Sequence, residues 1–201
     1  MWKWIGGVAL FLVVLLISGV CYGVNKMKQF AGDDGPATTM VGASADRVFA
    51  SLATGDSVTE WMAVSGSVRA SRNGELRVGD SVTVVPPNAA GERQRAGWIV
   101  TEVVPGKLLV LQMRNDSLGI VAASRRYALE ARGDSTAIIA TVAAPMLDAM
   151  KSGSRDSTTG GAVMTFASKM MLAGLRAQAK VELLQLKSRV EGRAASGAAQ
   201  P

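Results

Sequence analysis

Residues 162–191 decide the fold, and their sequence is AVMTFASKMMLAGLRAQAKVELLQLKSRVE. The stretch contains no proline, and its apolar residues recur mostly at steps of three, four or seven, which places them on one face of a helix. These residues are Met164, Met171, Leu175, Ala179, Leu183, Leu186 and Val190, and the opposite face carries Lys169, Arg176, Lys180 and Lys187. Roughly thirty residues at about 1.5 Å each predict a helix of about 45 Å. An apolar face of that length needs a broad apolar partner.

The middle of the chain supplies this partner as a run of predicted strands. Apolar residues change from helical spacing to alternation near Ser67, and turn signals such as Pro105-Gly106 and Gly133-Asp134 separate the segments. The candidate strands are 67–71, 76–85, 93–104, 107–114, 121–131 and 137–143, with a first strand at 38–42. Their regular spacing predicts an antiparallel meander that the long helix covers. A plain core helix or a coiled-coil arm is the alternative for 162–191.

Two short helices are predicted between the first strand and the meander. One spans 45–52, with Ser44 as its N-cap. The other is capped by Asp56 or Ser57 and ends near Trp61.

Composition excludes several classes of protein. The chain has 201 residues, a net charge of +6 and a pI near 9.8. Lys3, Lys26 and Lys28 are three of its 22 basic residues, which leaves 19 basic against 16 acidic residues from Ala31 onward. That balance and the few aromatic residues argue against a nucleic-acid-binding protein. The absence of histidine excludes Ser-His-Asp and Cys-His catalysis and histidine-bound zinc or haem.

Cys21 is the single cysteine, so intrachain disulfides and thiolate metal clusters are impossible. We therefore expect no cofactor and no metal. A chain with so little cysteine suits either redox compartment.

The N-terminus predicts a membrane anchor. Ile5–Val24 is a stretch of twenty residues without charge, about the length that crosses a bilayer, and Trp2 and Trp4 precede it. A cleaved signal peptide is the alternative, but the apolar run is long and no Ala-x-Ala site follows it. The expected organisation is an anchor at 1–28, a linker at 29–37, a domain at 38–192 and a disordered tail at 193–201. We expect a single-pass membrane protein with its domain outside the cytoplasm, in the periplasm.

Several stretches carry a family resemblance in the order of the predicted elements. They are ASADRVFASL at 43–52, VTEWM at 58–62, LRVGD at 76–80, WIVTEVVPGKLL at 98–109, YALE at 127–130 and LQLKSRVE at 184–191. Together they resemble the START-like helix-grip fold of the SRPBCC superfamily, closest to bacterial members of the polyketide cyclase/dehydrase type, some of which carry an N-terminal membrane anchor. The resemblance implies an α+β fold in which a curved antiparallel sheet grips the C-terminal helix around an apolar cavity. Its members include lipid carriers, hormone-binding proteins and cyclases, so the fold does not fix the function.

Candidate site residues follow from this expected cavity. Glu60 beside Trp61 is a possible acid or base in an apolar pocket, although a solvated helix residue is the commoner case. Glu102 is in phase with Trp98 and would point inward with it, or else lie on a surface strand.

Arg125 and Tyr127 could hold an anionic head group, and the alternation of a strand allows only one of Arg125 and Arg126 to face the cavity. Methionines adapt to irregular apolar ligands or simply fill a core. The candidates on the long helix are Met164, Met171 and Leu175.

Three functions are consistent with the sequence. The first is a membrane-anchored, non-catalytic domain that binds a small apolar or amphipathic molecule such as a lipid or pigment. The second is an accessory or scaffolding subunit of a membrane complex. The third is a cyclase-type enzyme that uses carboxylates, which ranks last because histidine, the commonest acid–base group, is missing.

Overall fold

The computed structural model describes residues 35–62, 67–85, 96–115, 119–147, 149 and 158–198, and the side chains of the last segment from 168 to 192. The predicted anchor at Ile5–Val24 lies outside this part of the chain. Within the described residues, no helix is both long enough and apolar enough to cross a bilayer.

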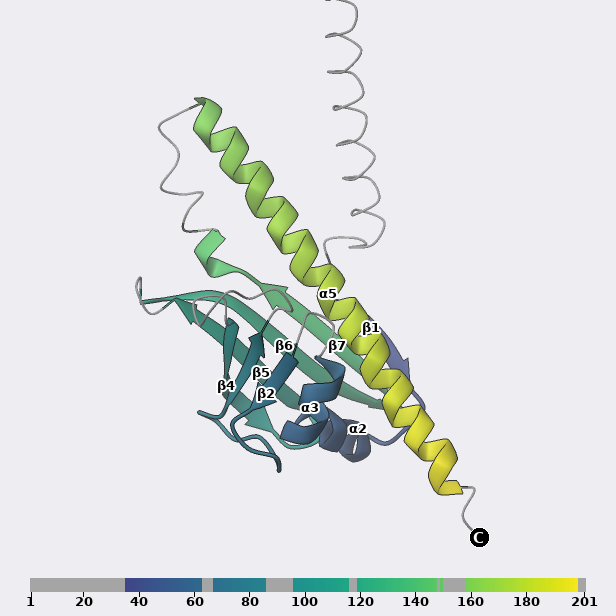
Figure 1. The fold of residues 1–201 in the computed structure, drawn as a ribbon. Coiled ribbons are helices and arrows are strands. Elements are labelled where there is room, and N and C mark those ends of the chain that lie inside the picture. Colours follow the sequence, from purple (N-terminus) through teal and green to yellow (C-terminus); the bar gives the residue numbers. More distant parts are fainter. Residues whose placement is uncertain are drawn as a thin grey trace, which may run out of the picture.

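The described chain folds into seven strands and three principal helices. In chain order they are β1 (Ala37–Val41), α2 (Ala45–Leu52), α3 (Gly55–Trp61), β2 (Ser67–Ala70), β3 (Ser81–Val85), β4 (Ala96–Val104), β5 (Leu108–Asn115), β6 (Ile120–Arg132), β7 (Ser135–Ala143) and α5 (Thr158–Ala198). Figure 1 shows α5 crossing one side of the sheet. All neighbouring strands are antiparallel, in the order β1-β7-β6-β5-β4-β3-β2.

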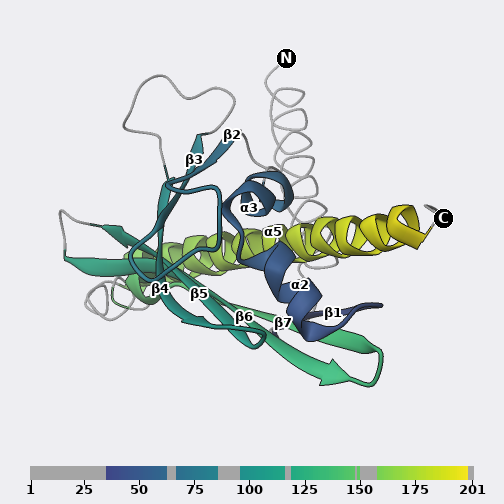
Figure 2. The same cartoon turned by 90° about the horizontal axis from the view of Figure 1, so that it is seen from below.

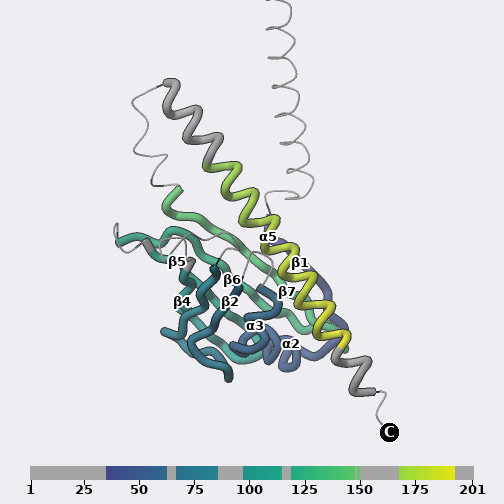
Figure 3. The backbone as a smooth tube through the Cα atoms, in the orientation of Figure 1, coloured from purple at the N-terminus to yellow at the C-terminus, as the bar shows by residue number. Residues whose placement is uncertain are grey.

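The sheet is curved and its concave face holds the helices. Figure 2 shows β2 and β3 curling up beside α3, while β7 and β1 form the opposite end of the sheet. The C-terminal half of α5 contacts β1 and β7, and it also contacts α2 and α3, which lie beside it in Figure 3. This arrangement confirms the predicted α+β helix-grip fold.

The two short helices begin close to where the sequence predicted. α2 starts behind Ser44, whose backbone is extended but whose side chain makes no capping hydrogen bond. α3 starts behind Thr54, so the predicted caps at Asp56 or Ser57 are wrong. The reason is tertiary: the carbonyl oxygens of the 73–74 turn accept hydrogen bonds from the first two backbone N–H groups of α3, at 2.9 and 3.1 Å. A side-chain cap is therefore not needed there.

The predicted strand at 76–85 is shorter than expected. Residues 76–80 form a turn in which the N–H of Arg77 donates to Asp80 Oδ2 at 2.8 Å, and Gly79 adopts a positive φ of 94°. Only glycine adopts that backbone conformation without strain. The strand β3 therefore begins at Ser81.

A bulge in β4 overturns one predicted orientation. The register between β4 and β5 shifts between Val100 and Glu102, so Thr101 is an extra residue. An extra residue moves the alternation of the following side chains by one position. Trp98 and Val100 face the core, but Glu102 is exposed and Val103 packs against the core in its place. The predicted inward orientation of Glu102 is wrong.

The helix α5 is longer than predicted, with 41 residues and a length of about 60 Å. Four residues of its predicted apolar stripe are buried, namely Ala179, Leu183, Leu186 and Val190, but Met171 is 48% exposed. Steps of four residues overshoot a full helical turn by about 40° each. Three such steps separate Met171 from Leu183, so Met171 has rotated away from the sheet.

We predict that Gly55→Ala destabilises the domain. A Cβ atom at this position would overlap the backbone carbonyl of Arg72, which cannot move without breaking the contact between α3 and the 71–74 segment. Overpacking of this kind costs about 1–3 kcal/mol. Urea unfolding measures the change, and Gly97→Ala is the matched control because no atom lies within 4 Å of its added Cβ. Equal stability of the two variants would show that the close approach is relieved by a small backbone shift.

Candidate functional site

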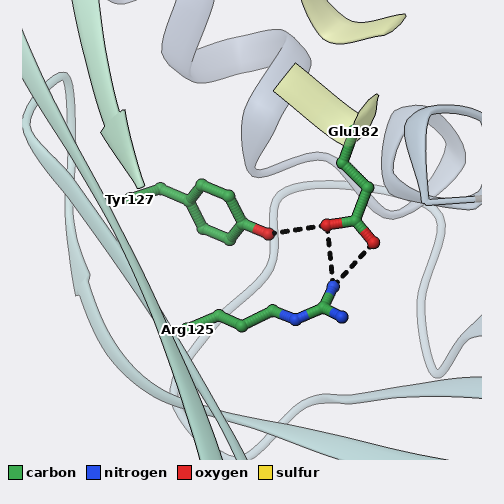
Figure 4. Close-up of polar contacts among 3 residues, drawn as sticks. All are labelled: Arg125, Tyr127 and Glu182. Carbon is green, nitrogen blue, oxygen red and sulfur yellow. Dashed lines mark hydrogen bonds and ion pairs between the residues drawn. The ribbon is translucent and has the colours of Figure 1, made fainter. Parts of the chain in front are cut away.

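Four side chains from three different elements meet on the concave side of the sheet. Strand alternation points Arg125 and Tyr127 of β6 toward α5, whereas Arg126 between them is exposed. Trp98 comes from β4, and Glu182 comes from the buried face of α5. As Figure 4 shows, Arg125 and Tyr127 both reach the carboxylate of Glu182.

The contacts within this cluster are short and closed to solvent. Nη1 of Arg125 donates to both oxygens of Glu182 at 2.7 Å, and the Tyr127 hydroxyl donates to Oε2 at 3.1 Å. Arg125 is 2% exposed and Glu182 is fully buried. A charge-assisted contact of this length is strong, but burial removes the hydration of both ions.

Two tryptophan rings complete the surroundings of the ion pair. The guanidinium of Arg125 lies 4.4 Å from the centre of the Trp98 ring, in cation–π geometry. The rings of Trp61 and Tyr127 meet edge to face, with centroids 5.4 Å apart and an interplanar angle of 77°. The ion pair is thus enclosed by aromatic surface.

Burial shifts the ionisation of all three polar groups. Burial and the charge of Glu182 raise the pKa of Tyr127, so its hydroxyl stays protonated and serves as a donor. Burial also raises the pKa of Glu182, because the opposing charge of Arg125 offsets the lost hydration only in part. Burial lowers the pKa of Arg125, but Tyr127 and Glu182 raise it by more, so the net shift is upward and Arg125 stays charged.

The described residues leave some buried donors without an acceptor. They are Nε of Arg125 and Nε1 of Trp61, together with the hydroxyl of Ser57 and Nε of Arg72 and Arg189. Buried donors without partners are few in native proteins, and an acceptor from water or a ligand is the usual explanation. Trp61 is the informative case because it also lines a surface groove.

Two further polar contacts fix α5 near its C-terminal end. Arg189 forms an ion pair with Glu60 of α3. The backbone N–H of Gly42 donates to Oε1 of Glu191 at 3.1 Å, which joins α5 to the end of β1. The helix is therefore held by polar contacts to β6, α3 and β1.

Two hollows lie on either side of α5. A solvent-open groove of about 530 Å³ runs between α3 and α5 and is lined by Glu60, Trp61, Val181, Leu184, Gln185, Ser188 and Arg189. A smaller pocket of about 100 Å³ lies between α5 and the β1–β7 edge of the sheet. The centre of the grip itself, where an apolar cavity was expected, is occupied by the Arg125–Glu182 pair and its aromatic neighbours.

The predicted site residues fall into different places. Trp61, Trp98, Arg125 and Tyr127 come together around Glu182, and Trp61 also lines the groove with Glu60. Leu175 packs against the core. Met171 and Glu102 are exposed, and the side chain of Met164 lies outside the described part. Within the described residues, no group of His, Cys, Asp or Glu side chains could hold a metal ion.

Sequence reasoning missed Glu182. Its spacing from Ala179 and Leu186 is three and four residues, so it lies in phase with the buried stripe of the helix. An acidic residue within an apolar stripe, together with one inward arginine on β6, was the available signal. The partner could not be identified without knowing which strand faces this turn of the helix.

We predict that Glu182→Gln lowers the free energy of unfolding by about 3–5 kcal/mol, because it leaves the buried Arg125 charge unpaired. Urea unfolding in non-ionic detergent measures the change, and Arg126→Gln is the exposed control, expected within about 0.5 kcal/mol of wild type. The charge-free double variant Arg125→Met/Glu182→Leu should recover most of the loss. An unchanged stability in Glu182→Gln would contradict this account.

We also predict that Tyr127 does not ionise in the folded domain. Its folded-state pKa is raised above the unfolded value of about 10, so the unfolded chain loses the phenol proton first. The stability from this group is complete below about pH 10 and declines as the pH rises above it. Phenolate absorbance should show Tyr127 ionising only as circular dichroism reports unfolding. Ionisation of both tyrosines with an unchanged dichroism spectrum would refute the prediction, and Tyr127→Phe identifies the late step.

Comparisons with known proteins agree with this fold. The structure is similar to the solution structure of the Aha1 dimer from Colwellia psychrerythraea, with 18% identity and a TM-score of 0.51 over 78% of this chain and 94% of that chain. It is also similar to the protein of unknown function SA2116 from Staphylococcus aureus, with 10% identity and a TM-score of 0.53 over 79% of this chain and 97% of that chain. At these identities the likeness shows the fold alone. A comparison with curated proteins gives no match.

The family assignment comes from a family model that matches residues 42–177. This range begins directly after β1 and ends within α5. It contains α2, α3, strands β2 to β7, and the two site residues of β6, Arg125 and Tyr127. The match confirms the resemblance to the SRPBCC superfamily found in the sequence. Because it covers more than half of the chain, the protein belongs to the family described as activator of Hsp90 ATPase homolog 1-like protein.

Proposed function

We propose that this protein is a membrane-tethered, non-catalytic binding domain that holds a small amphipathic molecule in the groove between α3 and α5. The observation that carries the proposal is the groove itself. Its volume of about 530 Å³ falls within the range of about 300–1,000 Å³ that is usual for small-molecule sites. Glu182, at the centre of the grip, is fully buried.

The lining of the groove has an apolar part and a polar part. Trp61, Val181 and Leu184 supply apolar surface, and Leu184 is 61% exposed. Glu60 and Arg189 contribute an ion pair to the same lining. A molecule with an apolar body and a polar or charged group matches both parts of this surface.

The placement of the ionisable groups supports binding rather than catalysis. The groups whose pKa shifts most clearly in the described residues are Arg125, Tyr127 and Glu182, and all three are buried and bonded to one another. Of the two carboxylates considered for acid–base chemistry, Glu60 is paired with Arg189 and Glu102 lies on an exposed strand position. Neither environment resembles the desolvated carboxyl that general acid–base catalysis requires.

The membrane tether rests on the sequence of Ile5–Val24, which is uncharged and long enough to cross a bilayer. The proposal includes a domain that lies outside the cytoplasm. Alkaline carbonate extraction tests the tether, and protease digestion of intact spheroplasts tests the orientation. Release of the chain by carbonate would count against a spanning segment.

A second candidate function uses the same groove to dock a protein partner. The groove is open to solvent, and Val181 and Leu184 expose 37% and 61% of their surface. Exposed apolar residues grouped on one face are typical of interaction sites. The family description names an activator of an ATPase, a role that depends on contact with another protein.

The groove is tested by Val181→Glu/Leu184→Glu, which places two charges on its apolar wall without touching the buried core. We expect wild type extracted in mild detergent to retain an amphipathic small molecule detectable by mass spectrometry, and the variant to lose at least about ten-fold of it, since burying an unpaired charge against an apolar ligand is strongly unfavourable. The matched control is Val78→Glu/Val104→Glu, two valines that are exposed elsewhere.

The possible results separate the two candidates. Equal retention in wild type and the groove variant would reject small-molecule binding at this site, as would wild type without any retained molecule. Native mass spectra that show a protein partner on wild type, absent from the groove variant alone, would favour docking instead.

A further inference from the structure

The pocket on the other side of α5 has a floor of small residues. Ala37 of β1, Ala140 of β7 and Ala179 of α5 face one another there, and each is buried. Larger side chains at these positions would close the space, since protein interiors are normally packed to high density. The three alanines instead leave a hollow of about 100 Å³ between the helix and the edge of the sheet.

The rim of this pocket is positively charged. Arg176 and Lys180 are separated by four residues on α5, which places them on the same side of the helix, and both line the pocket. Arginine presents a planar fork that fits phosphate oxygens, and lysine adds a point charge on an apolar stem. An anion with oxygen acceptors matches this rim, and a short apolar group matches the floor.

The position of the pocket along the chain indicates where the anion comes from. Gly35 lines the pocket and lies directly ahead of β1. The uncharged segment ends at Val24, and the ten residues between Val24 and Gly35, eleven Cα–Cα steps, span at most about 40 Å. With the tether proposed above in place, this edge is the part of the domain that the chain holds closest to the bilayer. Lipid head groups are then present at high effective concentration.

We propose that this pocket binds the phosphate of an anionic lipid head group, and that it fixes the β1–α5 edge of the domain against the bilayer surface. The inference rests on the proposed tether but not on the ligand of the α3–α5 groove. Arg176 and Lys180 contact the phosphate, and the alanine floor accommodates the glycerol carbon atoms next to it.

The experiment reconstitutes the full chain in nanodiscs of phosphatidylcholine with a minor fraction of phosphatidylglycerol, and native mass spectrometry identifies the lipids that stay bound after the disc is removed. We expect phosphatidylglycerol to be enriched on wild type by about 25-fold over its share of the disc, about five-fold for each cation near the anionic surface. Arg176→Gln/Lys180→Gln should abolish the enrichment, and Arg176→Lys/Lys180→Arg should retain most of it.

The control for net charge is Arg69→Gln/Lys107→Gln, which removes two exposed cations that do not line the pocket and should leave the enrichment unchanged. Equal enrichment in wild type and Arg176→Gln/Lys180→Gln would overturn the site, as would equal loss in the control. Binding of inorganic phosphate in pure phosphatidylcholine discs as tight as that of phosphatidylglycerol would overturn the assignment to a lipid. A chain that does not co-elute with the discs refutes the tether itself, which separates that failure from a failure of the pocket.

Discussion

Arg125 and Glu182 bring opposite charges from β6 and α5 to 2.7 Å in a place that solvent does not reach. Each ion has given up its hydration, and the contact between them is the main compensation. Tyr127 supplies one further hydrogen bond and Trp98 a cation–π contact. Because either charge alone would be strongly unfavourable there, the sheet and the helix depend on each other at this point. The other polar contacts of α5, from Arg189 to Glu60 and from Glu191 to Gly42, lie nearer its C-terminal end.

The two hollows described above lie on the two sides of α5 and not at the centre of the grip, where the ion pair lies. A helix-grip domain with an apolar interior can hold a ligand between its sheet and its helix, but here an ion pair and aromatic rings fill that place. On one side, α5 and α3 enclose an apolar groove with an ion pair in its lining. On the other side, α5 and the β1–β7 edge enclose a smaller pocket with a cationic rim. One helix thus forms a wall of two hollows with different chemistry.

Most of the fold was predictable from local patterns, because alternation, turn residues and helical spacing are properties of short segments. The order of strands and the two short helices follow from them. The wrong predictions concern places where contacts between distant segments determine the local structure. The bulge at Thr101 turns the side chain of Glu102 outward, and carbonyl groups of the 73–74 turn, instead of the predicted side-chain caps, accept hydrogen bonds from the start of α3. At the site, the inward orientation of the Arg125 and Tyr127 side chains was predictable from the alternation of β6 alone. Its partner Glu182 was not, since that pairing depends on how the helix crosses the sheet.

The ion pair also contributes to the register of α5, together with its apolar stripe. A slip of the helix by one turn would bring a charged residue such as Lys187 or Arg189 to a buried position that Leu183 or Leu186 now fills. The same slip would carry Glu182 about 5 Å from Arg125 and leave both charges buried without a partner. A polar contact within an apolar interface is a known means of fixing register. We infer that Glu182 has this role, and that the positions of the groove and the pocket, which both include residues of α5, depend on it.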